Sequence, residues 1–408
     1  MPDYDVSLPL DTDYFAAFAQ LAPEDRKVWD RARSLSAEAL PQMNDYWDRA
    51  DYPLHLVKRM GELNLLADGI DVPGLERMSP MAAGLVNMEV SRIDGSLGTV
   101  IAVQGGLALR SIAYFGSAEQ KERWLGPLAR GEEYGAFALT EPDHGSDSVG
   151  LTTTARLDGD EWVLNGEKKW IGNGSVGGVT VVWARVLGGG SETGGSESVG
   201  SESGGVRGFL VEQDTPGYEA ETITGKASLR AIFQARITLN EVRIPASNVL
   251  PGSHTFKDTS KVLVATRLGV AWSALGHATA VYEAALSYAN QRIQFGKPLA
   301  KFQLVQERLT QMLAELTGMQ LMCVQAATLE AAGALRPPQA SMAKYNNTRK
   351  ARQIASTARD MLGGNGILLE NHVIRHLLDI ESIHTYEGTE SVQTLLIGRD
   401  ITGQSAFA

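Results

Sequence analysis

The character of the sequence changes twice along its length, and this order limits the folds available to it. From about residue 12 to 130, apolar side chains recur every three or four positions, as in MAAGLVNMEVSRI, which is typical of helices. From about 134 to 250 the pattern becomes strand-like, as in TTTARLDGDEWVLNG and VTVVWARVL. Helical spacing returns after about residue 255. Because the two textures occupy separate regions, the alternating order of a doubly wound sheet is excluded.

The length of 408 residues exceeds what one hydrophobic core usually organises, so several domains are expected. The predicted fold class is α+β, mostly α. It has an N-terminal helical domain over residues 1–133, a β-barrel or sandwich over 134–252 and a C-terminal four-helix bundle over 253–408. Residues 188–205, GGGSETGGSESVGSESGG, contain almost no apolar side chains and predict a flexible loop between two strands.

Charge and composition exclude several classes of function. The net charge is −11 with no block of basic residues, which argues against a nucleic-acid partner. No apolar run is long enough to cross a bilayer, and the acidic first residues do not resemble a secretory signal. We therefore expect no membrane insertion and a cytoplasmic location.

Metal and disulfide chemistry are not expected either. The single cysteine, Cys323, lies in the apolar helical run LMCVQAA, where a small buried side chain is the favoured interpretation. His372 and His376 stand four residues apart with His384 nearby, but the pattern of a metal-binding helix is missing. Surface or interface histidines are the favoured interpretation, and no metal is predicted.

Two motifs of the β region contain residues suited to ligand binding. In FALTEPDHGSDS, residues 137–148, a turn at Gly145 and Ser146 combines with the hydroxyls of Thr140 and Ser146; a ligand site and a capped polar turn fit equally well. In EKKWIGNG, residues 167–174, Trp170 lies between a strand and a turn. Its ring could stack on a flat heterocycle or pack in the core.

Two further motifs lie in the C-terminal helical region. In RIQFGKP, residues 292–298, Arg292 follows a long helix, where it could clamp a phosphate or face solvent at a helix end. MLGGNGI, residues 361–367, ends a helix with glycines that permit left-handed caps or close approach of a ligand. The lysine of a P-loop is missing and no strand precedes the glycines, so neither a P-loop nor a Rossmann fingerprint is present.

The order of these motifs is more informative than any one of them. LTEPDHGSD, KKWIGNG, RIQFGKPLAKFQ, DMLGGNGI and finally TYEGT follow one another on a helix, strand, helix architecture. In this order they resemble the acyl-CoA dehydrogenases, from about residue 50 to the C-terminus. The last segment is most similar to the glutaryl-CoA dehydrogenase branch of that family.

The resemblance implies a non-covalently bound FAD, an acyl-CoA thioester as substrate and an electron-transferring flavoprotein as electron acceptor. It also implies a homo-oligomer, usually a tetramer built as a dimer of dimers, with the cofactor held across a subunit boundary. By position, the implied FAD-binding residues are Phe137, Leu139, Thr140, Trp170, Ile171, Gly172, Arg292, Gln294, Phe295, Gln303, Asp360, Gly363, Gly364 and Thr389. The implied substrate-binding residues are Ser146, Arg267 and Gly388, together with Ser91, Gly98 and Thr99 near the end of the acyl pocket.

Glu387, in TYEGT, matches the position of the catalytic base. Dehydrogenation next to a thioester requires a base for the α-proton and an acceptor for the β-hydride, and the flavin is that acceptor. A carboxylate can act as the base if desolvation raises its pKa toward neutrality. The backbone N–H of Glu387 and a flavin ribityl hydroxyl are the implied donors to the thioester carbonyl. In one branch of the family the base lies instead at the position of Thr266, which cannot do this chemistry.

Three departures from the family pattern concern the substrate and the flavin. Gly98 stands where the glutaryl-CoA branch has an arginine, and Ser91 where it has a glutamate, so an anionic acyl tail would meet no cation. Glutaryl-CoA is therefore not the predicted substrate. Gly172 replaces a hydroxyl residue near the flavin, which predicts either room for a bulkier acyl group or altered flavin reactivity. The alternatives are a decarboxylating glutaryl-CoA dehydrogenase, a flavin monooxygenase or oxidase on the same scaffold, and a non-catalytic member that binds flavin or CoA.

Overall fold

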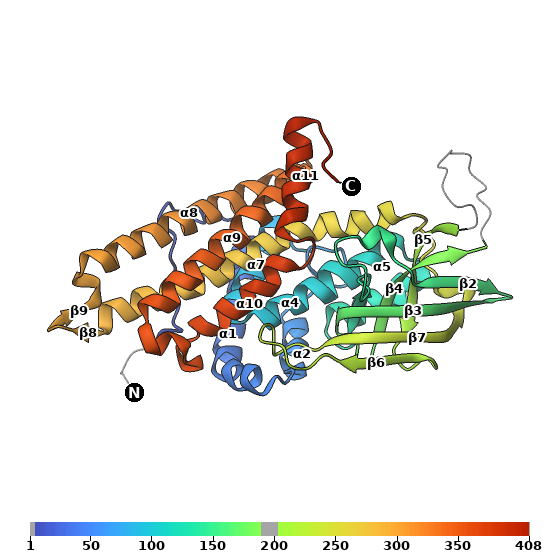
Figure 1. The fold of residues 1–408 in the computed structure, drawn as a ribbon, viewed down its shortest axis with the longest axis horizontal. Coiled ribbons are helices and arrows are strands. Elements are labelled where there is room, and N and C mark those ends of the chain that lie inside the picture. The colour runs from blue at the N-terminus through green and yellow to red at the C-terminus, as the bar shows by residue number, and fades with distance from the viewer. Residues whose placement is uncertain (1–4, 189–202, 408) are drawn as a thin grey trace.

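The structure is a computed structural model that describes residues 5–188 and 203–407 (Figure 1). The helices are α1 (Pro23–Arg49), α2 (Leu54–Glu62), α3 (Pro80–Ile93), α4 (Gly95–Val100), the π-helix η1 (Ile101–Leu109), α5 (Arg110–Phe115), α6 (Ala118–Ala129), α7 (Phe256–Gln291), α8 (Gln303–Ala331), α9 (Pro337–Met361), α10 (Val373–Thr385) and α11 (Glu390–Thr402). The strands are β1 (Gly135–Ala138), β2 (Thr154–Asp158), β3 (Glu161–Gly172), β4 (Val179–Leu187), β5 (Ser203–Glu212), β6 (Tyr218–Thr222), β7 (Gln234–Pro245), β8 (Ile293–Gln294) and β9 (Lys297–Pro298).

The predicted fold class is confirmed by this order of helices, sheet and helices. VTVVWARVL forms β4, and the stretch around the predicted turn at Asp158 and Gly159 forms the antiparallel pair of β2 and β3. Several helices begin where the sequence provides a cap. Ser117 and Thr255 each accept a backbone N–H in a capping box, which satisfies donors at the first turns of α6 and α7.

The sheet is mixed and β4 lies at its centre. One edge of β4 pairs in parallel with β1 and then with β2, and its other edge pairs antiparallel with β5. The path continues from β2 through β3 and β7 to β6. Trp183 packs on one face with α5, α6 and β1, whereas Trp162 and Phe209 pack on the other face. Both faces are therefore buried, and α5 and α6 pack against one of them.

The predicted flexible loop at 188–205 falls mostly on residues 189–202, which lie outside the described residues. The two strands on either side of it are antiparallel neighbours, since β4 pairs with β5 from Val179 to Leu187.

The C-terminal bundle is built on α7, whose 36 residues span about 54 Å at a rise of about 1.5 Å per residue. This helix runs from the sheet to the β8–β9 hairpin at the opposite end of the molecule (Figure 1). It packs along α8, α9 and α3 through a continuous apolar core that includes Cys323, as expected for a buried cysteine. Helix α7 therefore reaches both ends of the bundle.

The histidine prediction needs a correction. His376 is buried, because α10 packs against α7 and places its Nδ1 atom 2.8 Å from Nδ1 of His277. Burial lowers the pKa of His277 to about 3, so that ring is neutral at neutral pH. His372 is partly buried beside Arg375. Within residues 5–188 and 203–407, no group of His, Cys, Asp and Glu has a metal-binding arrangement.

A continuous helix over residues 95–115 consists of α4, η1 and α5. By length and composition alone this helix could cross a membrane, which the sequence pattern had not indicated. However, 72% of its apolar window is buried inside the protein, as in the core helix of a folded domain. Its central turns are π-helical, a distortion often found at functional sites.

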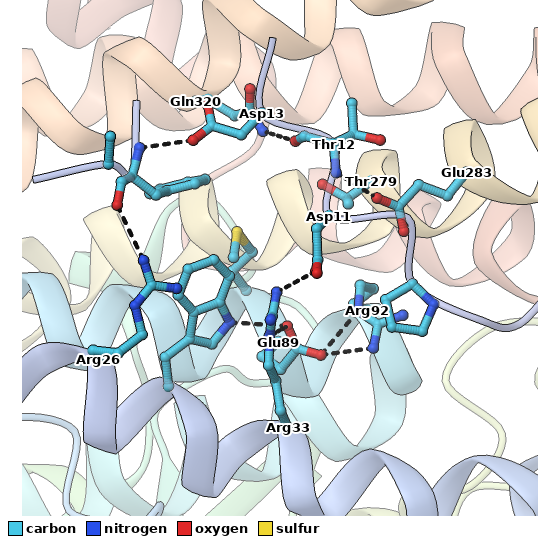
Figure 2. A pocket seen from close by; sticks show the side chains of 15 residues that line it. Asp11, Thr12, Asp13, Arg26, Arg33, Glu89, Arg92, Thr279, Glu283 and Gln320 are labelled. Atoms are coloured by element: carbon cyan, nitrogen blue, oxygen red, sulfur yellow. Dashed lines mark hydrogen bonds and ion pairs between the residues drawn. The ribbon is translucent and has the colours of Figure 1, made fainter. Parts of the chain in front are cut away.

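The N-terminal segment before α1 covers a cavity of about 200 Å³ between α1, α3, α7 and α8 (Figure 2). Glu283 accepts the backbone N–H groups of Leu10 and Thr12 at 3.0 and 2.9 Å, and Gln320 donates to the carbonyl of Thr12. Glu89 accepts from Arg92 and from Trp29 in the same region. Glu283 thus attaches the segment to α7, and Glu89 joins α1 to α3, so both carboxylates have structural partners.

Candidate active site

A second cavity, of about 380 Å³, lies where the sheet, η1, the start of α7 and the α10–α11 turn meet. It is mainly apolar, and the charged side chains that line it are Arg267 and Glu387. Its lining residues are Thr99, Ala102, Val103, Leu107, Phe137, Leu139, Thr140, Gly145, Ser146, Ser148, Trp170, Ile171, Gly172, Gln234, Leu263, Arg267, Thr385, Tyr386, Glu387, Gly388, Thr389 and Val392. A mainly apolar cavity with a few convergent polar groups is the usual form of a ligand site.

Glu387 lies in a tight turn between two helices. α10 ends at Thr385, and Thr389 caps α11 by accepting the N–H of Val392. Glu387 has φ of 52° and Gly388 has φ of 88°, so both lie in the left-handed region. This conformation is uncommon for a glutamate and is often found at functional sites. The turn brings the carboxylate to the cavity wall.

The surroundings of Glu387 act on its pKa in opposite directions. Burial raises the pKa of the carboxyl group, because the charged form is poorly solvated in the cavity. The hydroxyl of Thr266 donates to Oε2 at 2.7 Å and lowers the pKa, as do the charges of Lys344 and Arg267. Burial has the larger effect, so the pKa is raised overall.

Arg267 is a buried cation on α7, one residue after Thr266. Its Nη1 donates to the hydroxyl of Ser341 at 3.0 Å, whereas its Nε has no partner among the described residues. Burial lowers the pKa of Arg267, and the charge of Glu387 opposes that effect. Because Arg267 lines the cavity, its guanidinium group is a candidate donor to a polar group of a ligand there.

Trp170 lies at the edge of the cavity and 54% of its surface is exposed. The pairing of β3 with β7 shifts register between Lys168 and Ile171, and Trp170 there has φ of 64°. Such bulges redirect a side chain out of the regular alternation of a strand. Trp170 is therefore not a core residue, and its ring is available to stack on a flat ligand.

A buried ion pair that the sequence analysis missed joins the first two motifs. Lys168 donates to Glu141 at 3.0 Å and to the carbonyl of Leu139, and both charged side chains are almost fully buried. Glu141 also accepts from Thr152 and Thr153, and these partners lower its pKa to about 2 despite burial. Glu141 in LTEP and Lys168 in KKW are the residues from which this ion pair could have been predicted. The pair fixes the segment that forms the apolar wall.

Gly172 lies against η1 and has little free space. A Cβ atom built on Gly172 would lie 2.8 Å from Cγ2 of Val103, which is closer than such contacts normally are. The side chain of Val103 therefore occupies the side on which the missing hydroxyl residue would project. The expectation of additional room for a bulkier acyl group at Gly172 has no support in this geometry.

Near Thr99 and Tyr386 the lining of the cavity carries hydroxyl groups. Thr99 lines it, and the hydroxyl of Tyr386 bonds with Thr99 and Ser273. Ser91 is fully buried behind this layer, where its Oγ donates to Ser273 at 2.8 Å. A Cβ on Gly98 would lie 2.2 Å from Oγ of Ser91, so no larger side chain fits there without displacement.

The remaining predicted FAD-binding residues are not near this cavity. Arg292 follows α7, 25 residues after Arg267, which corresponds to about 37 Å along a helix. Phe295 is 92% exposed at the tip of the β8–β9 hairpin (Figure 1). The others on that side of the molecule are exposed too; they are Gln294, Gln303, Asp360, Gly363 and Gly364. Within one chain, the predicted site residues around Glu387 lie together in the cavity. The group that includes Arg292 and Phe295 does not line it.

Scaffold and site together define a class of enzyme. A buried carboxylate faces an apolar cavity that has an aromatic ring at its edge and a guanidinium group in its lining. This arrangement suits proton abstraction beside a flat, redox-active cofactor, which is the chemistry of a flavin-dependent oxidoreductase.

Family models place the chain within this class. The N-terminal, middle and C-terminal domain models of acyl-CoA dehydrogenase match residues 22–132, 136–242 and 256–402. The chain belongs to the acyl-CoA dehydrogenase family. Members of this family use FAD and act on CH–CH bonds of acyl-CoA thioesters, so the predicted cofactor and type of reaction are confirmed.

Individual relatives lie in more than one branch. The short-chain specific acyl-CoA dehydrogenase of mouse mitochondria (Mus musculus) is 37% identical over 353 residues, which are 85% of this chain and 82% of the mouse protein. A glutaryl-CoA dehydrogenase of Mycobacterium smegmatis in complex with FADH2 is 37% identical, with a TM-score of 0.91 over 97% of this chain and 98% of that one. Another structure of glutaryl-CoA dehydrogenase from that organism is 40% identical, with a TM-score of 0.90 over 96% and 97% of the two chains.

Proposed function

We propose that Glu387 removes the α-proton of a short, neutral acyl-CoA thioester. The observation that carries this proposal is the position of its carboxylate in the cavity, where burial raises its pKa while Thr266 fixes Oε2. A base with a raised pKa accepts a proton more readily than an exposed carboxylate does. When bound, FAD supplies the acceptor for the β-hydride.

The chain contributes two further functions to this step. Phe137, Leu139 and Trp170 would support the flavin ring on the sheet side of the cavity. The N–H of Glu387 has no acceptor among the described residues, so it is available to donate to the thioester carbonyl. Such a donor stabilises the negative charge that develops on this oxygen as the proton leaves.

The acyl group would be neutral because the lining near Thr99 and Tyr386 offers hydroxyl groups, and the cation in the lining, Arg267, interacts with Glu387 instead. The hydroxyl of Tyr386 is already bonded with Thr99 and with Ser273. A carboxylate placed beside them would lose its hydration without gaining a cation, and this desolvation costs several kcal/mol. The short-chain specificity in the name of the mouse relative agrees with this inference, whereas the names of the Mycobacterium smegmatis structures do not.

Substrate choice can be tested by following the flavin absorbance during anaerobic titration with acyl-CoA thioesters. Butyryl-CoA or a similarly small neutral thioester should bleach the flavin, and glutaryl-CoA should do so at least about tenfold more slowly at equal concentration. Hexanoyl-CoA and longer thioesters serve as the length series. Fast reduction by glutaryl-CoA with release of CO₂ would contradict the neutral-substrate proposal but leave Glu387 as the base.

Replacing Thr266 by Val should move the pH dependence of flavin reduction to higher pH. The hydroxyl stabilises the charged carboxylate, so its loss raises the pKa of Glu387 further. Because the base must be deprotonated, the acidic limb of the kcat/KM profile should shift upward, and activity should fall most at low pH. An unchanged acidic limb would show that another group sets it.

The oligomer, the electron acceptor and the location are also proposals. We infer that Arg292, Gln294, Phe295 and the exposed residues near Gly363 contact the FAD of a partner subunit, since Arg292 lies about 37 Å from Arg267 along α7 and none of the others lines the cavity. A tetramer and an electron-transferring flavoprotein as acceptor rest on the family resemblance, and a cytoplasmic location rests on the acidic first residues, which do not resemble a secretory signal. All three remain predictions. So do the domain limits 1–133, 134–252 and 253–408.

A further inference from the structure

The turn that carries Glu387 is fastened by a buried lysine from another helix. Lys344 lies on α9 and only 1% of its surface is exposed. Its Nζ donates to the backbone carbonyl of Tyr386 and, at 2.5 Å, to that of Gly388. These two carbonyls belong to the residues immediately before and after Glu387, so one ammonium group joins both sides of the turn.

A second side chain completes the attachment. Nε2 of Gln393, on α11, donates to the carbonyl of Glu387 at 3.2 Å and to that of Gly388 at 3.0 Å. Every carbonyl from Tyr386 to Gly388 therefore accepts from a buried side chain. This support matters because Glu387 and Gly388 both have positive φ, a conformation that the surrounding structure has to impose.

Fixing a carbonyl also fixes the N–H of the same peptide. In a trans peptide the C=O and the following N–H point in opposite directions in one plane. The carbonyl of Tyr386 and the N–H of Glu387 share such a plane, and the structure contains no cis peptide bonds among its described residues. The bond from Lys344 to that carbonyl thus determines where the N–H of Glu387 points.

We propose that Lys344 is a positioning residue, which holds the Tyr386–Glu387 peptide so that its N–H is aimed at the thioester carbonyl. The inference rests on the proposed function, because it assumes that this N–H and the Glu387 carboxylate act on the same thioester. The charge of Lys344 also favours ionised Glu387, but that contribution does not depend on peptide orientation.

The test uses the FAD-loaded enzyme and acetoacetyl-CoA, whose acidic α-proton allows the bound thioester to ionise without a redox step. The near-ultraviolet absorbance of the enolate then reports how well the site stabilises negative charge on the thioester oxygen. Lys344→Met keeps the length of the side chain but removes the donors. Lys344→Gln removes the charge but keeps a donor for the Tyr386 carbonyl. Gln393→Met removes the donor to the carbonyls of Glu387 and Gly388. Lys350→Met is the matched control, since Lys350 is on the same helix and pairs with Glu315 away from the turn.

We expect Lys344→Met to lower the enolate fraction at least about tenfold and kcat by about 10²-fold, with a smaller change in KM. Lys344→Gln should retain most of the enolate fraction, Gln393→Met should lower it by less than Lys344→Met does, and Lys350→Met should match the wild type. If Lys344→Met does not fold, Lys344→Gln decides the question by the same absorbance.

Two results would overturn the inference. Equal enolate fractions in all variants would mean that the lysine is only structural. A loss in Lys344→Gln as large as that in Lys344→Met would mean that charge, not orientation of the peptide, is what Lys344 contributes. A wild-type enzyme whose flavin no acyl-CoA reduces would instead refute the proposed function itself.

Discussion

Glu387→Gln should lower the rate of flavin reduction by the best acyl-CoA substrate about 10²- to 10⁴-fold, the usual contribution of general-base catalysis. Glutamine has nearly the same shape but cannot accept the α-proton. Stopped-flow absorbance of the flavin under anaerobic conditions measures this rate directly. Substrate binding should persist, because Arg267 and the apolar wall are unchanged.

The control for this variant is Glu390→Gln, three residues further on at the start of α11. Glu390 pairs with His384 at 3.2 Å and does not line the cavity. In the Glu390→Gln enzyme, the substrate should reduce the flavin at the wild-type rate.

Glu387→Gln should also unfold no more easily than the wild type, because a group whose pKa is raised by burial opposes folding once it is ionised. If the flavin of Glu387→Gln is reduced at the wild-type rate, a residue other than Glu387 is the base.

Arg375→Leu should destabilise the protein by about 3–5 kcal/mol, the cost of leaving one charge of a buried pair without its partner. Arg375 pairs with Asp94, and both side chains are completely buried. This ion pair connects α10 with the end of α3, so it joins the C-terminal bundle to the N-terminal helices. The midpoint of urea unfolding, measured on the FAD-loaded enzyme, should fall accordingly.

Two further variants separate the buried charge from other effects. Arg352→Leu removes a comparable pair with Glu381 at the surface and should cost at most about 1 kcal/mol. Adding Asp94→Asn to Arg375→Leu removes the stranded negative charge and should recover part of the lost stability. If Arg375→Leu is no less stable than Arg352→Leu, the pair contributes nothing beyond a surface contact.

The arrangement of helices and sheet could be predicted because it depends on local patterns. The apolar period differs between VTVVWARVL and the helices, and the turn at Gly159 separates β2 from β3 in a way that neighbouring residues determine. The role of Glu387 was predicted differently, from the resemblance of five ordered motifs. A single carboxylate between two helices would not have indicated its burial.

The parts that could not be predicted depend on contacts between distant residues. Lys168 and Glu141 are 27 residues apart, and Lys344 reaches Gly388 across 44 residues. His376 was expected at the surface or at an interface, because nothing near it in the sequence shows that His277 packs against it. Such partners are determined by the packing of helices on the sheet, and a local pattern of apolar and polar residues does not specify them.

The length of α7 has a genetic consequence if the proposed sharing of FAD between subunits holds. Each chain would then contribute the base side of one site and the Arg292 side of its neighbour's site. A chain damaged at Glu387 and a chain damaged at Arg292 would each be inactive alone. Combined in one oligomer, they would complement each other, since one of their shared sites would contain both intact halves.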